Sequence, residues 1–149
     1  VDDILVCGFK ITKEIGIKAE KESTDWNDKH ILIVEDVEEN YFLLASVLGA
    51  TQAQITRAES GKEALDIIKS GNRIDLILMD IMMPEMDGFE TTKKIREMDQ
   101  NVPIIAQTAH QSENSKEKSI KAGCNDFITK PIELKSFMRV VSKYLNEKD

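Results

Sequence analysis

The feature that most constrains the fold is a short apolar run, residues 76–79, that stops at a single acid, Asp80. A turn with Pro84 and Gly88 and then an amphipathic segment follow it. A carboxylate at the end of a buried strand lies where open α/β sheets carry out their chemistry. Asp80 could instead cap the next helix, but Asp87, directly before Gly88, suits that role better. We therefore take Asp80 as a candidate reactive or metal-binding group.

The same order of apolar run, polar end and helical segment occurs five times. Short runs rich in β-branched residues favour strands that are buried on both faces. Strands are predicted over 31–34, 52–58, 74–79, 102–107 and 126–129. Helices are predicted over 38–48, between Ser60 and Gly71, and over 89–98, 112–122 and 132–145. Five such βα units predict an α/β fold with a doubly wound parallel sheet and helices on both faces.

Residues 1–28 differ in composition from the rest of the chain. We predict that they are a linker from a preceding domain, and that one domain covers 29–149. Within the linker, residues 4–9 could form one short strand. Trp26 could pack on the following domain, but we favour an ordered linker residue. Because the first residue is not Met, we expect the sequence to be a piece of a longer protein or a processed chain.

Bulk composition excludes several functional classes. The net charge of −7 argues against a nucleic-acid surface, which is normally basic. No apolar run approaches the roughly 20 residues of a membrane span, and the first residues lack the positive region of a secretory leader. Cys7 and Cys124 form no metal or redox spacing, which favours reduced thiols and a cytoplasmic location.

Because the predicted strands run parallel, their carboxyl ends lie on one edge, and that edge collects most of the chemistry. The residues brought there are Glu35, Asp36, Asp80, Thr108 and Lys130. Three neighbouring carboxylates repel one another and need a cation, and oxygen ligands without His or Cys favour Mg²⁺, with Mn²⁺ as an alternative. A lysine and a hydroxyl suit the oxygens of a phosphoryl group, and a carboxylate can itself be the nucleophile.

Each of these residues also has a simpler explanation. Glu35 and Asp36 could cap a helix, Thr108 could be an ordinary strand-end hydroxyl, and Lys130 could be a solvated cation. Their occurrence at successive strand ends favours a joint role in holding a phosphoryl group near a carboxylate. Asp80 is the best candidate nucleophile, since its strand has partners on either side.

Four motifs in order carry a resemblance to a known family. They are Ile-Leu-Ile-Val-Glu-Asp at 31–36, Leu-Met-Asp-Ile-Met-Met-Pro-Glu-Met-Asp-Gly at 78–88, Thr-Ala-His at 108–110 and Asp-Phe-Ile-Thr-Lys-Pro at 126–131. Together they resemble the response-regulator receiver domain over about residues 29–147. The resemblance implies a flavodoxin-like (βα)5 fold with strand order 2-1-3-4-5.

The resemblance also implies a function and a metal site. Asp80 would accept a phosphoryl group from the phosphohistidine of a histidine kinase or of a histidine phosphotransfer domain. Asp36, Asp80 and the backbone carbonyl of Met82 would ligate Mg²⁺, and Glu35 would act through a metal-bound water. Met82 and His110 would lie at the pocket rim and tune the lifetime of the phosphoryl group.

The remaining implied roles concern signalling. Lys130 would pair with the phosphoryl oxygens, Thr108 would move to bond one of them, and Phe127 would then turn inward as the switch aromatic. The Lys130–Pro131 peptide bond is expected to be cis. The output would be a population shift at the face made by the fourth helix, the fifth strand and the fifth helix.

The parent protein is a separate question. We favour the C-terminal receiver of a hybrid sensor histidine kinase, with a stand-alone response regulator as the alternative and a regulator whose effector is missing as a third. The receiver would catalyse only its own phosphorylation and dephosphorylation, whereas the parent could be a kinase with a membrane anchor. An Asp-dependent phosphatase of the haloacid dehalogenase type would need a second acid where Met82 stands. Neither a Gly-rich dinucleotide fingerprint nor a P-loop pattern is present.

Overall fold

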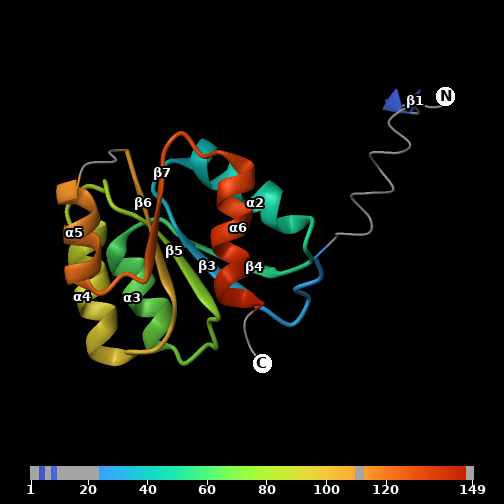
Figure 1. The fold of residues 1–149 in the computed structure, drawn as a ribbon. Helices are drawn as coiled ribbons and strands as arrows, with labels where there is room; N and C mark the ends of the chain where they lie inside the picture. Colours follow the sequence, from blue (N-terminus) through green and yellow to red (C-terminus); the bar gives the residue numbers. More distant parts are fainter. Residues whose placement is uncertain (1–3, 6–7, 10–23, 110–112, 147–149) are drawn as a thin grey trace.

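The computed structural model describes residues 4–5, 8–9, 24–109 and 113–146 (Figure 1). The predictions made for Cys7 and His110 lie outside these residues. Near the start of the chain, β1 (Ile4–Leu5) pairs antiparallel with β2 (Gly8–Phe9). The single strand predicted over 4–9 is therefore wrong, because an antiparallel pair requires the chain to reverse direction between its two strands.

Five parallel strands form the central sheet. They are β3 (His30–Val34), β4 (Gln54–Ala58), β5 (Leu76–Asp80), β6 (Ile104–Thr108) and β7 (Asp126–Thr129). Their spatial order is β4-β3-β5-β6-β7, and every neighbouring pair is parallel. Counted from β3 as the first strand of the sheet, this is the predicted 2-1-3-4-5 order, and it confirms the doubly wound α/β fold.

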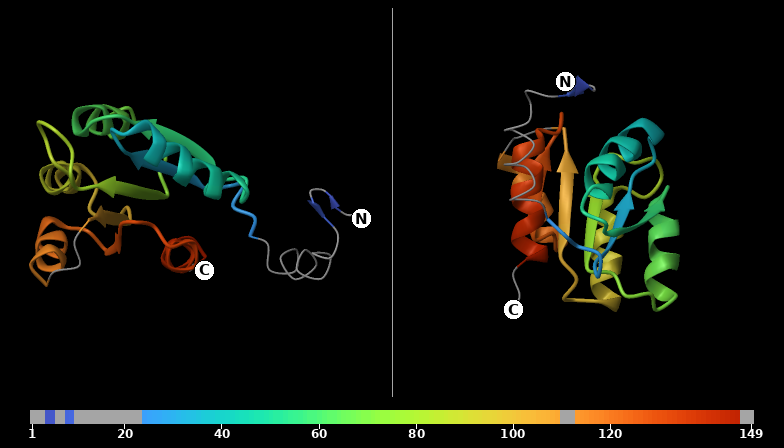
Figure 2. Two further views of the ribbon diagram at one scale, coloured as in Figure 1. Left: turned by 90° about the horizontal axis from the view of Figure 1, so that it is seen from above. Right: turned by 90° about the vertical axis from the view of Figure 1, so that its right-hand side faces the viewer.

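Helices cover both faces of this sheet (Figure 1, Figure 2). They are α2 (Glu38–Gly49), α3 (Gly61–Lys69), α4 (Gly88–Met98), α5 (Glu113–Ala122) and α6 (Leu134–Leu145). The pair α2 and α6 lies on one face, and α3, α4 and α5 lie on the other (Figure 1). In the described part of the chain, none of the helices is long and apolar enough to span a bilayer.

The continuous apolar runs reflect burial on both faces of the sheet. Along β5, Ile77 and Met79 enter the core beneath α3, α4 and α5, whereas Leu76 and Leu78 enter the core beneath α2 and α6. All four side chains are 0% exposed. Burial of each such side chain contributes about 1.5–3 kcal/mol, so the central strand that carries Asp80 is firmly anchored.

Local sequence signals determine where α3 and α4, two helices that begin near the carboxyl edge of the sheet, start. Asp87 caps α4 by accepting a hydrogen bond from the Glu90 amide at 2.9 Å, as predicted. Ser60 caps α3 by accepting from the Glu63 amide at 3.1 Å. The Glu63 carboxylate in turn accepts from the amide of Glu59, one residue before the position that a standard capping box uses.

Trp26 packs into the domain instead of standing in a linker. Its side chain is 2% exposed and belongs to the core beneath α2 and α6. The indole Nε1 donates to Oδ1 of Asn146 at 2.7 Å, and the Trp26 amide donates to the carbonyl of Thr51 at 2.7 Å. The interpretation of Trp26 as an ordered linker residue is therefore wrong. A large apolar ring gains from burial, and its N–H finds a partner past the last helix.

Candidate active site

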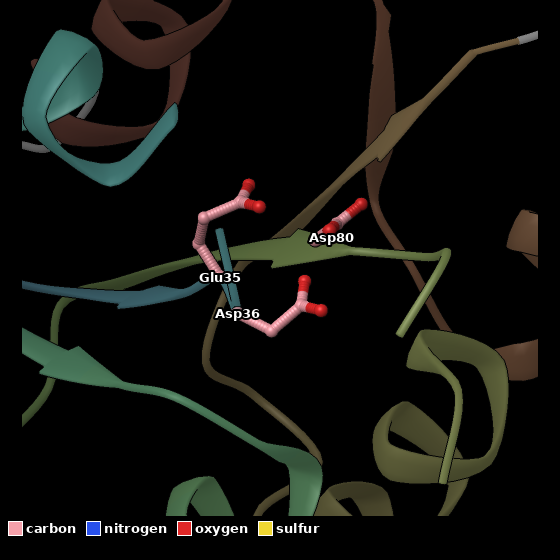
Figure 3. Close-up of side chains that lie close together, drawn as sticks. All are labelled: Glu35, Asp36 and Asp80. Atoms are coloured by element: carbon pink, nitrogen blue, oxygen red, sulfur yellow. The ribbon is translucent and has the colours of Figure 1, made fainter. Parts of the chain in front are cut away.

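Three carboxylates meet at the carboxyl edge of the sheet (Figure 3). Glu35 and Asp36 directly follow β3, and Asp80 is the last residue of β5, the neighbouring strand. One oxygen from each carboxylate lies within 4.8 Å of the others. Glu35 is 0% exposed and Asp80 is 2% exposed, whereas Asp36 is half-buried. The structure thus brings together the three acids that the sequence placed at this edge.

Lys130 supplies a positive charge to this cluster. Its Nζ lies 3.1 Å from Oδ1 of Asp80 and 3.7 Å from Oε1 of Glu35. The residue directly follows β7, and the Lys130–Pro131 peptide bond is cis. The Lys130 amide donates to the carbonyl of Thr108 at 2.8 Å, which ties the ends of β6 and β7 together. Lysine, acids and threonine therefore converge from four different strand ends.

Thr108 and Phe127 occupy the two strands beside the cluster. Thr108 is the last residue of β6 and is 5% exposed, so it lies at the same edge as Asp80. Phe127 lies on β7, is half-buried and packs against the core beneath α3, α4 and α5. Nζ of Lys116 lies 5.8 Å from the centre of the Phe127 ring. Helix α5 thus contacts the aromatic residue that lies on β7 three residues before Lys130.

The loop after Asp80 is held close to the strand that it leaves. The Met82 amide donates to Oδ1 of Asp80 at 3.3 Å, while the Met82 side chain is 67% exposed. The Gly88 amide donates to the carbonyl of Ile81 at 3.0 Å. A Cβ at Gly88 would stand 2.4 Å from the backbone oxygen of Asp80, so only glycine allows this approach. Met82 accordingly lies at the rim of the acid cluster.

The acids are electrostatically unbalanced. Burial, followed by repulsion from Asp80, raises the pKa of Glu35 to about 7, although Lys130 acts in the opposite direction. Among the described residues, Oε1 of Glu35 and Oδ1 of Asp36 are buried and have no hydrogen-bond partner. Buried oxygens are normally satisfied. Carboxylate oxygens that meet without enough donors fit a hard divalent cation such as Mg²⁺.

Two residues that support Glu35 escaped the sequence reasoning. Asn40 donates from Nδ2 to Oε2 of Glu35 at 3.3 Å, and Arg57 donates from Nε to the Glu35 backbone oxygen at 3.2 Å. Arg57 pairs in register with Ile33 on the neighbouring strand. A charged residue inside the predicted strand 52–58 was the available signal, because Arg has to find acceptors when it is half-buried.

Comparison with known proteins agrees with this geometry. The family model "Response regulator receiver domain" matches residues 31–142. The polar-differentiation response regulator DivK of Brucella anthropi is 37% identical over 121 residues, which are 80% of this chain and 98% of DivK. The chain therefore belongs to the response-regulator receiver family, and it is a receiver domain of two-component signalling.

Two solved structures share the fold. One is the receiver domain of a Saccharomyces cerevisiae response regulator in a co-crystal with its histidine phosphotransfer protein, with a TM-score of 0.75 and 32% identity over 79% of this chain and 89% of that chain. The other is the receiver domain of a Pseudomonas aeruginosa sensor histidine kinase with a magnesium ion in its active-site cleft. It has a TM-score of 0.73 and 30% identity over 80% of this chain and 98% of that chain.

Proposed function

We propose that Asp80 accepts a phosphoryl group from a phosphohistidine on a partner protein. The observation that carries the proposal is the partly buried contact of 3.1 Å between Nζ of Lys130 and Oδ1 of Asp80, beside a cluster of three carboxylates. Lys130 lies near two acids, with Asp36 as a third in the cluster, and has more negative charge around it than it can neutralise. Such a site is prepared for an incoming phosphoryl group together with a divalent cation.

In the proposed reaction a carboxylate oxygen of Asp80 attacks phosphorus. The new O–P bond forms as the N–P bond to the donor imidazole breaks, and the imidazole leaves with the electron pair of that bond. Lys130 and the Thr108 hydroxyl bind phosphoryl oxygens as charge develops on them. Positioning and charge neutralisation account for most of the acceleration in this type of transfer.

The acids define where the cation would be held. Asp36, Asp80 and the carbonyl of Met82 are the proposed direct ligands, and Glu35 acts through a water. Among the described residues, buried oxygens of Glu35 and Asp36 have no hydrogen-bond partner, which supports this choice. When bound, Mg²⁺ would offset the charge of the carboxylates and of the phosphoryl oxygens.

The proposed output is a change in the equilibrium between two arrangements of the face that α5, β7 and α6 form. Thr108, buried at the end of β6, would move toward the phosphoryl group, and Phe127, half-buried on β7, would turn further inward. Phosphorylation can shift this equilibrium only through contacts that differ between the two arrangements. The proposed contact between Thr108 and the phosphoryl group is one such difference.

The partner would be a histidine kinase or a histidine phosphotransfer protein. Apolar side chains that a partner could cover lie on the elements that frame the site. Met82 follows Asp80, Val37 precedes α2 and Leu134 begins α6, with exposed fractions of 67%, 41% and 51%. The S. cerevisiae relative was crystallised with a phosphotransfer protein, which supports this class of partner.

For the parent protein, the hybrid sensor histidine kinase remains our proposal, with the residues before Trp26 as the connector and the receiver on the cytoplasmic side. Support comes from the P. aeruginosa neighbour, which is the receiver of a sensor histidine kinase. The stand-alone alternative has support from DivK, because the match extends over 98% of that regulator.

The test uses a small phosphodonor with a matched pair of variants. Incubation with Mg²⁺ and acetyl phosphate should add one phosphoryl group, detected by intact-protein mass. Asp80→Asn should abolish the labelling, because an amide is a poor nucleophile. Asp75→Asn changes an acid at the opposite edge of the sheet and should leave the labelling intact. Equal labelling of Asp80→Asn and the unsubstituted protein would exclude Asp80 as the acceptor.

A further inference from the structure

A buried amide next to the acid cluster has no role in the function proposed so far. Gln107 on β6 is 1% exposed, and its Nε2 has no hydrogen-bond partner among the described residues. An unsatisfied buried donor shifts the equilibrium away from the state that contains it, and toward one in which the donor is bonded, by roughly 5- to 150-fold. An apolar residue of similar size would avoid this cost, so the amide needs an explanation.

The register of the sheet places this amide beside Asp80. Gln107 on β6 is the direct in-register partner of Asp80 on β5, so the two side chains project from the same face. Two residues earlier on the same strands, Leu78 and Ile105 lie in the core beneath α2 and α6. Asp80 and Gln107 therefore form a polar layer above an apolar one.

Lys130 approaches this layer from the far side of β6. It follows β7, whereas Asp80 lies on β5, and β6 runs between these two strands. Because Nζ of Lys130 reaches to 3.1 Å from Asp80, its side chain spans the end of β6, where Gln107 lies. The Gln107 amide is therefore enclosed by the same three strands that hold the acid and its lysine.

We propose that Gln107 is a positioning residue that donates a hydrogen bond from Nε2 to an oxygen of the phosphorylated Asp80 side chain. The proposal rests on phosphorylation of Asp80, as proposed above. Adjacent strands are about 4.8 Å apart, a distance that a glutamine side chain can bridge. A phosphoryl group brings three acceptor oxygens to a place where, in the part of the chain that the structure describes, this donor has no partner. The amide thus disfavours the unphosphorylated state and favours the phosphorylated one.

The test compares Gln107→Met with the unsubstituted protein, because methionine keeps the length of the side chain and removes the amide. Gln107→Leu serves as a second variant. The control is Ile105→Val, which alters a buried residue on the same strand and face without changing a polar group. The probe is beryllofluoride with Mg²⁺, a stable analogue of an aspartyl phosphate. Its affinity is measured by calorimetry, and the melting temperature is measured without ligand in EDTA.

We expect Gln107→Met to weaken beryllofluoride binding by about 5- to 30-fold and to raise the melting temperature of the ligand-free protein by about 3 °C. Ile105→Val should lower the melting temperature and leave the affinity unchanged. If Gln107→Met and Gln107→Leu bind the analogue as tightly as the unsubstituted protein, the role of Gln107 is overturned while Asp80 phosphorylation stands. If the unsubstituted protein neither labels with acetyl phosphate nor binds the analogue, both proposals fail.

Discussion

The two edges of the sheet treat their polar residues in opposite ways. At the amino edge, Asp75 accepts a hydrogen bond from the His30 amide at 2.8 Å and forms an ion pair with Arg73 at 2.9 Å. The His30 ring contacts the hydroxyl of Thr56 at 2.6 Å. At the carboxyl edge, Glu35 keeps a buried oxygen without a hydrogen-bond partner among the described residues.

This difference separates polar groups that support the fold from polar groups that await a ligand. Hydrogen-bonded groups at the amino edge hold the chain in place there. Buried groups without hydrogen-bond partners at the carboxyl edge lower the stability of the ligand-free protein, and a bound ligand would remove that loss. Shape alone would mislead, because a hollow of about 510 Å³ lies at the amino edge, lined by residues such as His30, Thr56 and Asp75. Unsatisfied charge, and not concavity, distinguishes the edge at which we propose phosphoryl transfer.

The comparison is tested most severely by removing one cation from each edge. In EDTA, Lys130→Met should destabilise the protein by about 3 kcal/mol, because it leaves buried acids without their cation. Arg73→Met should cost less than about 1 kcal/mol, because the Arg73 side chain is 72% exposed. Urea denaturation measures both values. Similar losses for the two variants would contradict the distinction between the edges.

The pH dependence of stability should come from the carboxyl edge. Because Glu35 has a pKa of about 7 in the folded protein against an ordinary 4.5, the folded state binds a proton more tightly than the unfolded state. This contribution is fully present below about pH 4.5 and is lost as pH rises through 7. In EDTA, the unfolding free energy should therefore fall by about 2 kcal/mol between pH 5 and 8 relative to that of Glu35→Gln.

Saturating Mg²⁺ supplies the complementary measurement. A cation held by the acids favours the ionised form of Glu35 and stabilises the folded state by mass action. The fall in unfolding free energy between pH 5 and 8 should then largely disappear. A fall of equal size in Glu35→Gln would assign the pH dependence to other groups, and a melting temperature indifferent to Mg²⁺ would count against the metal site.

One type of substitution should change stability in opposite directions at the two edges. Without metal, Asp80→Asn should stabilise the protein by about 1 kcal/mol, because it removes one of three mutually repelling charges and still offers Lys130 an acceptor. Asp75→Asn should destabilise it by about 1–2 kcal/mol, because one amide oxygen cannot replace both carboxylate oxygens. Urea midpoints of the two variants decide the question, and equal signs would break the comparison.

The sequence was sufficient for the strands and helices of the five βα units and for the edge on which the acids meet. A continuous apolar run such as 76–79 is typical of a strand that is buried on both faces of a sheet. Parallel strands then bring Glu35, Asp80 and Lys130 to one edge, whatever the exact register of the strands. These predictions depended only on local pattern and on topology, which tolerate errors of a residue or two.

What the sequence could not supply depended on distant partners or on exact register. The hydrogen bond from the buried Trp26 to Asn146 joins residues 120 positions apart, and no local sequence pattern indicates it. The unpaired amide of Gln107 has meaning only because register sets it opposite Asp80. Arg57 reaches the Glu35 backbone oxygen from another strand for the same reason.

A small effect is expected at the amino end of the domain. Trp26→Phe keeps an aromatic ring in the core beneath α2 and α6 but removes the hydrogen bond of 2.7 Å from Nε1 to Asn146. Asn146 is exposed, so water can replace the lost donor, and the loss should be about 1 kcal/mol in urea denaturation. Because this contact lies away from the acid cluster, the rate of labelling by acetyl phosphate should not change. A slower rate in Trp26→Phe would show that the two ends of the domain are coupled, and the division between a structural edge and a reactive edge would then be too simple.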